Sequence, residues 1–410
     1  MSVCRIDNST AQHSTAQHST AQHSTADNRL NFHKKKILLV TSYGDGNYGN
    51  YGTILQRYAL SRVIESLGFE VHHLYSFSKP KKPDYFGEFV IRPVKTLIKR
   101  MLALIGIRKY LDKEIRYKNF QDFFNKKFSK KIETFTEQYI NNKIFMSHDE
   151  VLSADKSRWE EYNFVVTGSD VIWWRPTLKG AEYYYLEFIP REKRVCYAPS
   201  FGVLQFPEEE YEIHKKGLEG FNKLSCREQG GVNLIKQTIN KDAQLVLDPT
   251  LLLNASQWRE LEKKPDIDLP EHYALKFFYG EIPPEYDKAI KQAAGDLPIV
   301  NLCTCPDLPG CIAEVSEFLY LFNHADLIFT SSFHGTAFSI NFGKNFYSFV
   351  HKGDHSGRIN SILNSLNLTN HLYTPESKAR PDEINYNEVN EKLNILRESS
   401  LKYLRDCLHV

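Results

Sequence analysis

The chain has 410 residues, 41% of them hydrophobic, and a formal net charge of +2, which predicts a globular protein with room for two domains. The longest apolar run, 101–107, is too short to cross a bilayer, and the polar N-terminus lacks the apolar centre of a secretory signal, so we expect a cytoplasmic protein. Seven cysteines at irregular positions do not form a regular disulfide framework.

The first 33 residues contain three copies of the pentapeptide S-T-A-Q-H, from Ser9 to His23. A polar, repetitive stretch of this kind buries too little apolar surface to offset the entropy lost on ordering. We therefore predict a disordered tail over residues 1–33.

After this tail, a first β-α-β unit is expected. The run KILLVTS at 36–42 is typical of a buried parallel strand, and 53–67 has the periodicity of a helix that covers a sheet. Polar residues of this helix, Arg57 among them, are expected to face away from the sheet. The next strand, 69–75, completes a right-handed unit.

The glycine-rich turn inside this unit, YGDGNYGNYG, matches neither a dinucleotide fingerprint nor a Walker loop. Glycines ahead of a helix can present backbone amides to an anion or a sugar. Asn47 and Asn50 are therefore candidates for hydrogen bonds to substrate hydroxyls. The alternative is that both residues only support tight left-handed turns.

The segment 92–131 is strongly basic, with 13 basic and three acidic side chains, and its apolar residues recur at helical spacing. A basic amphipathic excursion of this kind, spanning 90–131, fits contact with an anionic membrane surface, which would place the protein at the inner face of the membrane. The alternative is a solvated helical region that packs on its own domain.

Later strands of the first domain are expected in YNFVVTGSD, RVCYAPSFG and AQLVLDPTLLL, all of which end in small or polar residues. Ligands of open parallel sheets lie beyond the carboxyl ends of the strands, so these ends should gather at one crevice. A second sheet is predicted from runs at 273–279, 298–302, 327–330 and 346–350. The predicted fold class is α/β, with two Rossmann-like doubly wound domains that face a cleft.

We place the domain boundary in the charged, proline-containing stretch that begins near residue 255. The expected organisation is an N-terminal Rossmann-like domain at 34–260, a C-terminal one at 261–385, and a last helix at 386–410. Two facing domains favour a reaction that joins two substrates, with the acceptor on the first domain and the donor on the second.

The sequence TGSD, 167–170, leaves a carboxylate at the end of a predicted strand. Asp170 can there accept a proton or orient an attacking hydroxyl, and a helix cap is the alternative. The tryptophans that follow, Trp173 and Trp174, can make an apolar wall or stack on a sugar face.

Arg227, in LSCREQGG, carries the group best suited to bidentate capture of a carboxylate or a phosphate. A surface salt bridge with Glu228 or Glu192 is the competing explanation. The residue is therefore a candidate anion clamp.

His334 gives the sharpest signal of the chain. Its imidazole titrates near neutrality, and a helix expected from Thr336 would aim its free amides toward whatever lies beside the ring. Ser331, Ser332 and Gly335 add small donors and room. A histidine in a loop between a strand and a helix, flanked by small residues, is a catalytic candidate.

The thiols of Cys303, Cys305 and Cys311 lie close together in the sequence. Their spacing matches no familiar zinc pattern, and a fourth partner is not evident. We expect no metal, and no pattern of basic and aromatic residues indicates a nucleic-acid surface.

Taken together, these motifs resemble those of the polysaccharide pyruvyl transferase family. The turn G-N-x-G-N, VVTGSDVIWW, CYAPSFG, LSCREQGGVNLI, VLDPTLLL and ADLIFTSSFHGTAFSINFGK occur in that family's order, over roughly residues 35–368. The resemblance implies a fold like that of GT-B glycosyltransferases and phosphoenolpyruvate as co-substrate, with no cofactor. It also implies a cell-surface glycan, such as an exopolysaccharide or capsule, or its lipid-linked precursor as acceptor.

The resemblance further implies that Asp170, Arg227 and His334 line the cleft. On this hypothesis His334 is the general acid and base, Arg227 binds the donor's carboxylate or phosphate, and Asp170 binds the acceptor hydroxyl. The candidate substrate-binding residues are Asn47, Asn50, Gly168, Ser169, Ser200, Phe201, Lys276, Ser331, Ser332, Gly335 and Arg358.

The sequence departs from the family's pattern at two positions. Val171 stands where many members have glutamine, and Ser332 stands where many have an arginine two positions before the histidine. Candidate replacements for that cation are Lys276, Lys344, His351, Lys352 and Arg358. Two alternatives stay open: a GT-B glycosyltransferase that uses a nucleotide sugar, and a glycan-binding relative without activity.

Overall fold

The structure, a computed structural model, describes residues 34–42, 50–77, 130–174, 180–278, 282–302, 313–350 and 357–410. The repeat tail, residues 43–49 of the glycine-rich turn, the three neighbouring thiols and nearly all of the basic segment lie outside these residues. The interpretations of those parts therefore stay predictions. Residues 34–410 belong to one compact unit.

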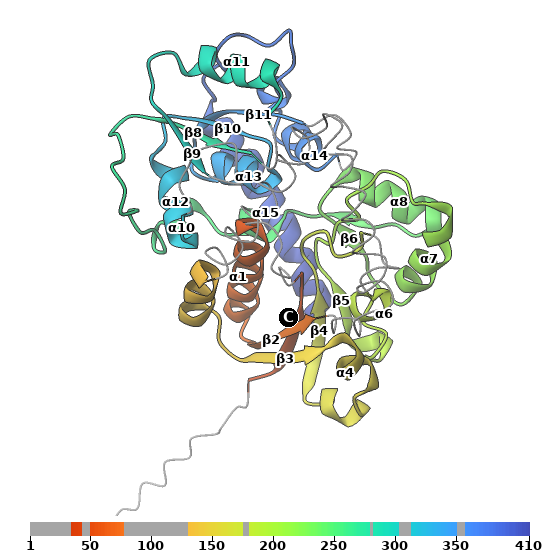
Figure 1. Cartoon of the computed structure of the whole chain (residues 1–410). Helices are drawn as coiled ribbons and strands as arrows, with labels where there is room; N and C mark the ends of the chain where they lie inside the picture. Colours follow the sequence, from red (N-terminus) through yellow and green to blue (C-terminus); the bar gives the residue numbers. More distant parts are fainter. Residues whose placement is uncertain are drawn as a thin grey trace, which may run out of the picture. The chain divides into compact units, whose positions relative to one another are not determined.

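Five parallel strands form the first sheet, in the spatial order β3-β2-β1-β4-β5 (Figure 1). They are β1 (Lys36–Val40), β2 (Glu70–Phe77), β3 (Lys143–Ser147), β4 (Tyr162–Thr167) and β5 (Arg194–Cys196). This is the order of a Rossmann sheet, in which the direction of winding reverses between β1 and β4. A ligand crevice is expected beyond the carboxyl ends of those two strands.

Four parallel strands form the second sheet, in the order β11-β10-β8-β9. They are β8 (Ala274–Phe277), β9 (Ile299–Leu302), β10 (Leu327–Thr330) and β11 (Asn345–Ser348), which confirms the four predicted runs. Here the winding reverses between β8 and β10, so the second crevice lies beyond the ends of those strands. The two sheets confirm the predicted α/β fold with two Rossmann-like units.

The last strand predicted for the first domain, in AQLVLDPTLLL, is much shorter than expected, and a short strand that was not predicted lies before it. β6 (Ser225–Cys226) and β7 (Gln244–Leu245) pair with each other in a small parallel sheet of their own. The run that was expected to continue β7 turns instead into the short helix α9 (Pro249–Leu252). Asp248 caps this helix by accepting a hydrogen bond from the Thr250 amide, and Pro249 suits the first helical position.

Helices pack around both sheets. Those of the first half are α1 (Tyr51–Ser66), α4 (His148–Ser153), α6 (Ala181–Tyr184), α7 (Tyr211–Glu219), α8 (Gln229–Ile239), α9 and α10 (Ala255–Arg259), with a further helical stretch at 130–139. Those of the second half are α11 (Pro284–Ala294), α12 (Val315–His324), α13 (Phe333–Asn341) and α14 (Arg358–Ser365), followed by α15 (Tyr386–Leu408). Single 3₁₀ turns are η3 (Lys156–Trp159), η4 (Arg191–Lys193), η5 (Glu208–Glu210) and η6 (Thr369–His371).

Helix α1 is buried on nearly every side, because it packs on the first sheet and also against the second half. The ring of Tyr51 stacks on Phe318 with 4.5 Å between centroids, and its hydroxyl donates to the carbonyl of Ala313 at 2.9 Å. The expectation that Arg57 faces solvent is therefore wrong. This side chain is 1% exposed, and Nη2 donates to the carbonyl of Thr41 at 3.2 Å.

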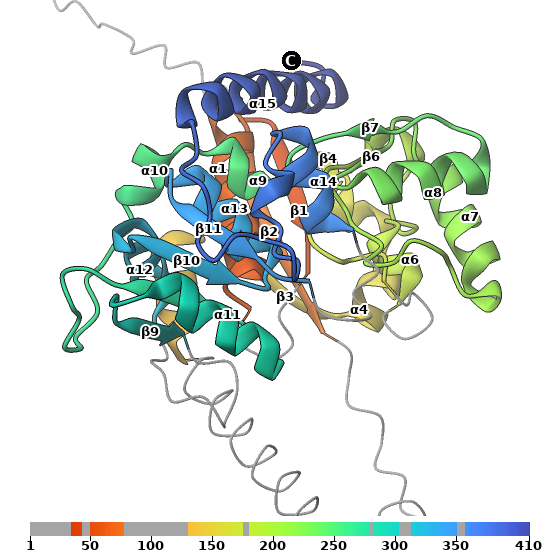
Figure 2. The ribbon, with the colours of Figure 1, turned by 90° about the horizontal axis from the view of Figure 1, so that it is seen from above.

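Helix α15 matches the predicted last helix and returns to the first half of the chain. It lies along one side of the molecule, next to α9 (Figure 2). The hydroxyl of Ser400 accepts a hydrogen bond from the Leu247 amide at 2.9 Å, and that of Tyr403 donates to the carbonyl of Cys196 at 3.0 Å. One hydrophobic cluster contains residues of both sheets and of α15, so the two halves share a continuous core.

Replacing Ser400 by alanine should lower the free energy of unfolding by about 1–3 kcal/mol, because the buried Leu247 amide loses its acceptor. Urea denaturation followed by far-UV circular dichroism measures the change. The control is Asn390→Ala on the same helix, at an exposed position, where the cost should stay below about 0.5 kcal/mol. Equal costs for the two variants would contradict the docking of α15.

Candidate active site

The two residues predicted to react follow the strands at which the sheets reverse. Asp170 lies just after the end of β4, and His334 lies just after the end of β10. Helix α13 begins at Phe333, earlier than the helix start expected at Thr336. His334 is therefore in the first turn of the helix and not in the loop before it.

The guanidinium of Arg227 connects these two strand ends. Its Nη1 donates to Oδ2 of Asp248 at 2.7 Å, and its Nη2 donates to Oδ1 of Asp170 at 3.3 Å. Its central carbon lies 4.8 Å from the ring centroid of Phe333. Glu228 is also buried, 3.8 Å from Nε, so the alternative of a surface salt bridge does not apply.

Asp248, which the sequence analysis missed, is the centre of this network. Its Oδ2 accepts hydrogen bonds from Arg227 and from the hydroxyl of Ser169 at 3.0 Å. Its Oδ1 accepts from the amide and the hydroxyl of Thr250, at 3.0 and 2.7 Å. Nε2 of His334 lies 3.8 Å from Oδ2, just beyond hydrogen-bond length. The sequence feature that could have identified Asp248 is its position directly before a proline at the end of a predicted strand.

Electrostatics keep both aspartates ionised. Burial alone would raise the pKa of Asp248, but the neighbouring His334 and Arg227 outweigh it and hold this pKa far below its usual range. Burial likewise opposes ionisation of Asp170, and the charges of Arg227 and His334 lower its pKa. Burial dominates at Glu228 and raises the pKa of that carboxyl despite the nearby Arg227.

His334 packs against the first turn of α1 and is 4% exposed. A β-carbon on Gly52 would lie 1.9 Å from Nδ1 of the imidazole, so only glycine leaves room for the ring. The next residue, Thr53, donates its hydroxyl to Oδ2 of Asp170 at 2.8 Å. Neither Gly52 nor Thr53 was predicted as a site residue, although Gly52 ends the glycine-rich turn that had been singled out and Thr53 directly follows it.

Gly168 and Ser169 shape the backbone around the carboxylates. Gly168 has φ +111°, and a β-carbon there would lie 2.1 Å from the carbonyl oxygen of Tyr197, so the position requires glycine. Ser169 is fully buried, and its amide donates to Oε1 of Gln56 at 3.2 Å. Because its hydroxyl also supports Asp248, Ser169 is placed to hold the network and not to face a ligand directly.

The hydroxyl of Ser332 stands where the family pattern has an arginine. It caps α13 by accepting a hydrogen bond from the Gly335 amide at 3.3 Å. Gly335 itself leaves no space for a side chain, because a β-carbon there would lie 2.2 Å from Oγ1 of Thr330. Asn50 has the same capping role at α1, where its side chain accepts from the Thr53 amide at 3.3 Å.

The other predicted residues lie at different depths. Ser200 and Phe201 are fully buried, and the Phe201 amide donates to Oε1 of Glu228 at 3.3 Å. Ser331 donates its amide to the carbonyl of Phe277 at 3.2 Å, at the reversal of the second sheet. Asn47, like His351 and Lys352, lies outside the described residues.

Among the candidate replacement cations, Arg358 lies at the start of α14. Burial has the largest effect on the pKa of Glu228 and raises it, whereas the positive charge of Arg358 lowers it. Lys276 is 3.3 Å from Asp287 and is therefore already paired. Burial lowers the pKa of Lys344. Arg358 is thus a described candidate whose charge acts on one of the carboxyl groups around Arg227.

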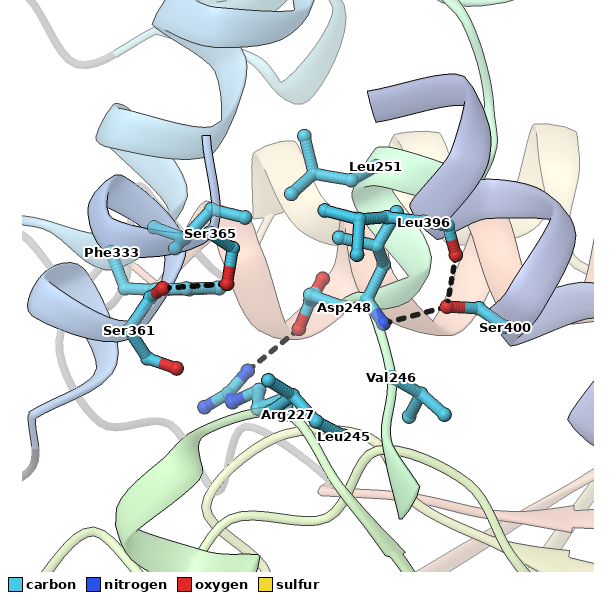
Figure 3. A pocket seen from close by; sticks show the side chains of 12 residues that line it. Arg227, Leu245, Val246, Asp248, Leu251, Phe333, Ser361, Ser365, Leu396 and Ser400 are labelled. Atoms are coloured by element: carbon cyan, nitrogen blue, oxygen red, sulfur yellow. Dashed lines mark hydrogen bonds and ion pairs between the residues drawn. The ribbon is translucent and has the colours of Figure 1, made fainter. Parts of the chain in front are cut away.

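A pocket adjoins the ion pair of Arg227 and Asp248, between the two halves of the chain (Figure 3). Its walls are Arg227, Leu245, Val246, Leu247, Asp248, Leu251, Phe333, Ser361, Ile362, Ser365, Leu396 and Ser400. Most of these side chains are apolar, which strengthens the attraction between the charges they surround. His334 does not line this pocket, but its Nε2 lies 3.8 Å from Oδ2 of Asp248, and an imidazole beside an ionised carboxylate is suited to carry a proton.

Within the described part of the chain, no three His, Cys, Asp or Glu side chains are arranged to hold a metal ion. In the same residues, no helix combines the length and the apolar composition needed to span a membrane.

A profile of the polysaccharide pyruvyl transferase family matches residues 50–353 of this chain. No match was found among curated proteins. Solved structures that are similar to this chain include a putative UDP-N-acetylglucosamine 2-epimerase of Listeria monocytogenes, with 11% identity, 90% of each chain covered and a TM-score of 0.45. HepE of Anabaena, in complex with UDP and glucose, has 11% identity, 91% and 95% coverage and a TM-score of 0.45. UDP-GlcNAc 2-epimerase of Neisseria meningitidis has 9% identity, 91% and 94% coverage and a TM-score of 0.45.

Replacing Asp248 by asparagine should destabilise the protein by about 3–5 kcal/mol at neutral pH, because buried Arg227 loses its shortest ion pair. The pKa of Asp248 is lower in the folded than in the unfolded chain. The contribution of ionised Asp248 to the free energy of unfolding is therefore complete above about pH 5 and is lost as the pH falls further.

The difference in unfolding free energy between wild type and Asp248→Asn should accordingly narrow in acid, and urea denaturation over a pH series measures it. Asp296→Asn, at an exposed position, is the control and should change stability by less than about 0.5 kcal/mol at any pH. A difference that stays constant down to pH 3 would contradict the depressed pKa.

Proposed function

Because this chain belongs to the polysaccharide pyruvyl transferase family, we propose that it transfers the enolpyruvyl group of phosphoenolpyruvate to sugar hydroxyls, forming a pyruvate ketal. The acceptor is a surface glycan or its lipid-linked precursor. The family indicates a transferase that acts on a polysaccharide, and the donor and the ketal product are the further steps of the proposal.

One observation carries the proposal: side chains from four of the family-like motifs meet at a single point between the two halves. Arg227 binds Asp170 at 3.3 Å and Asp248 at 2.7 Å, and His334 lies 3.8 Å from Asp248. These are the groups that the reaction requires, namely a proton carrier, ionised carboxylates and a cation that holds them.

The reaction needs proton transfers that these groups can mediate. The methylene carbon of the donor gains a proton and becomes a methyl group, two sugar oxygens bond to the central carbon, and phosphate leaves with the second hydroxyl proton. We assign the proton transfers to His334, whose Nε2 lies 3.8 Å from Oδ2 of Asp248. Asp170 is assigned to orient the acceptor hydroxyl.

Arg227 takes a different role from the clamp expected from its sequence. Its two terminal nitrogens already donate to Asp248 and Asp170, and three carboxylates surround it. A donor anion would have to compete with these partners, so we propose that Arg227 chiefly positions the carboxylates. The N-terminus of α13 and Arg358 are then the groups that favour the donor's negative charge.

Ligand stabilisation against heat distinguishes the possible donors. Phosphoenolpyruvate at 100 times its dissociation constant should stabilise the folded protein by about 2.7 kcal/mol, whereas UDP and pyruvate at equal concentration should not. Differential scanning fluorimetry measures the shift. Stabilisation by UDP alone would favour a glycosyltransferase that uses a nucleotide sugar. If neither phosphoenolpyruvate nor UDP stabilises the protein, the proposed donor is contradicted.

Phosphate release from phosphoenolpyruvate that depends on added glycan would then separate an enzyme from a glycan-binding relative. His334→Ala should lower this rate by about 10²- to 10⁴-fold, because the proton carrier is removed. His272→Ala, at an exposed position far along the chain, is the matched control and should keep the wild-type rate. Near wild-type release by His334→Ala would refute the assignment.

A further inference from the structure

The short helix α9 is held against α13 by the side chain of Asn341, at the C-terminal end of α13. Nδ2 of Asn341 donates to the carbonyls of Thr250 and Leu253, at 3.0 and 2.9 Å. This side chain is buried. A helix as short as α9 leaves its carbonyl groups without partners inside the helix, so Asn341 supplies donors that these groups need.

Arg397 of α15 completes this contact. Its Nε donates to the carbonyl of Leu251 at 2.6 Å, and its Nη2 donates to Oδ1 of Asn341 at 3.1 Å. Its Nη1 donates to Oδ1 of Asn394, on the same helix, at 3.0 Å. All three nitrogens of the guanidinium therefore have partners, and two of these partners belong to α9 and α13. We call Asn341 and Arg397 the α9 brace.

The helix that carries Asn341 also carries the proposed proton carrier. His334 and Asn341 are seven residues apart on α13, which is about two turns, so both lie on one face of the helix. Helix α9 packs against α13. Oδ2 of Asp248, the N-cap of α9, lies 3.8 Å from Nε2 of His334, and the carbonyls of α9 bind Asn341. The position of α9 therefore determines the separation between the carboxylate and the imidazole.

Helix α15 holds the chain on both sides of Asp248. The hydroxyl of Ser400 accepts a hydrogen bond from the amide of Leu247, the residue before Asp248, at 2.9 Å. One helical turn earlier, Arg397 binds the carbonyl of Leu251, at 2.6 Å. The segment that contains the carboxylate is thus fixed at two points by a single helix.

The separation of 3.8 Å is sensitive to small movements of α9. It is about 1 Å longer than a usual N–H···O hydrogen bond. Nε2 of His334 makes no hydrogen bond within the described part of the chain. A shift of α9 by about 1 Å would therefore decide whether Asp248 reaches the imidazole, and a misplacement of that size can lower a rate by about 10²-fold.

We propose that the α9 brace positions the carboxylate of Asp248 relative to the imidazole of His334, and thereby sets the rate of proton transfer. The part that concerns proton transfer rests on the proposed function. Asn341 and Arg397 are positioning residues, because they act through α9 and do not bond to the proton carrier. Arg397 also lies outside residues 50–353, which match the family profile.

A double-mutant cycle in the rate separates positioning from a purely structural role. Asn341→Asp keeps the shape of the side chain but replaces both donors by an oxygen that repels the two carbonyls. The kcat of glycan-dependent phosphate release should fall about tenfold or more, with an unchanged KM for phosphoenolpyruvate. In the His334→Ala background the same substitution should have no further effect. An equal loss in both backgrounds is the result of a structural defect and would overturn the proposal.

Arg397→Ala keeps the proposal testable should Asn341→Asp fold poorly, and its kcat should fall in the same direction. Arg397→Lys should recover part of the loss, because an ammonium group can still donate to the carbonyl of Leu251. The matched control is Arg405→Ala on the same helix, where the guanidinium pairs with the exposed Glu398 at 3.5 Å. This control should keep the wild-type kcat, and an equal kcat for Arg397→Ala would overturn the proposal.

Unfolding free energies test the brace without any need for turnover. The cost of Asn341→Asp together with Asp248→Asn should be smaller than the sum of the two single costs, because a displaced α9 has already weakened the contacts of Asp248. Urea denaturation measures all three variants. Additive costs would reject the brace and leave the phosphoenolpyruvate chemistry intact. A smaller combined cost, in a protein that releases no phosphate from phosphoenolpyruvate, would support the brace and reject the proposed donor.

Discussion

The structure depends on a guanidinium that is buried among carboxylates. Removing such ions from water costs several kcal/mol each, and their attraction offsets that cost only when each partner is held at hydrogen-bond distance. Arg227 follows β6, Asp170 follows β4 and Asp248 precedes α9, so three separate segments have to be placed together. The left-handed turn at Gly168 and the buried hydroxyl of Ser169 serve that placement.

The same cluster determines which charges the site accepts. Three carboxylates surround one guanidinium and one imidazole, so hydroxyl groups can donate hydrogen bonds to the carboxylate oxygens. A phosphorylated donor needs positive charge from groups outside this cluster. Ser332, in the place of an arginine, contributes only a helix cap. In our proposal, the amides at the start of α13 and the side chain of Arg358 therefore stabilise the donor's negative charge more than Arg227 does.

The segment after β4 holds two adjacent tryptophans in opposite environments. The ring of Trp173 lies 5.1 Å from that of Tyr185 in the core, while Trp174, one residue on, remains exposed beside Gly202. A buried tryptophan thus anchors an exposed one. In the same short segment, the Val171 amide donates to Oδ1 of Asp170 at 2.8 Å, which connects this backbone to the polar cluster.

By itself the sequence determined the parallel strands, their order along the chain and the polar residues at their ends, because local apolar runs and turn chemistry are written in neighbouring residues. Asp170 and His334 could be singled out in this way. Only the tertiary structure decided that Arg57 is buried, that Asp248 completes the site, and that Trp174 and not Trp173 is exposed. Burial depends on what packs opposite a side chain, and a one-dimensional pattern does not contain that partner.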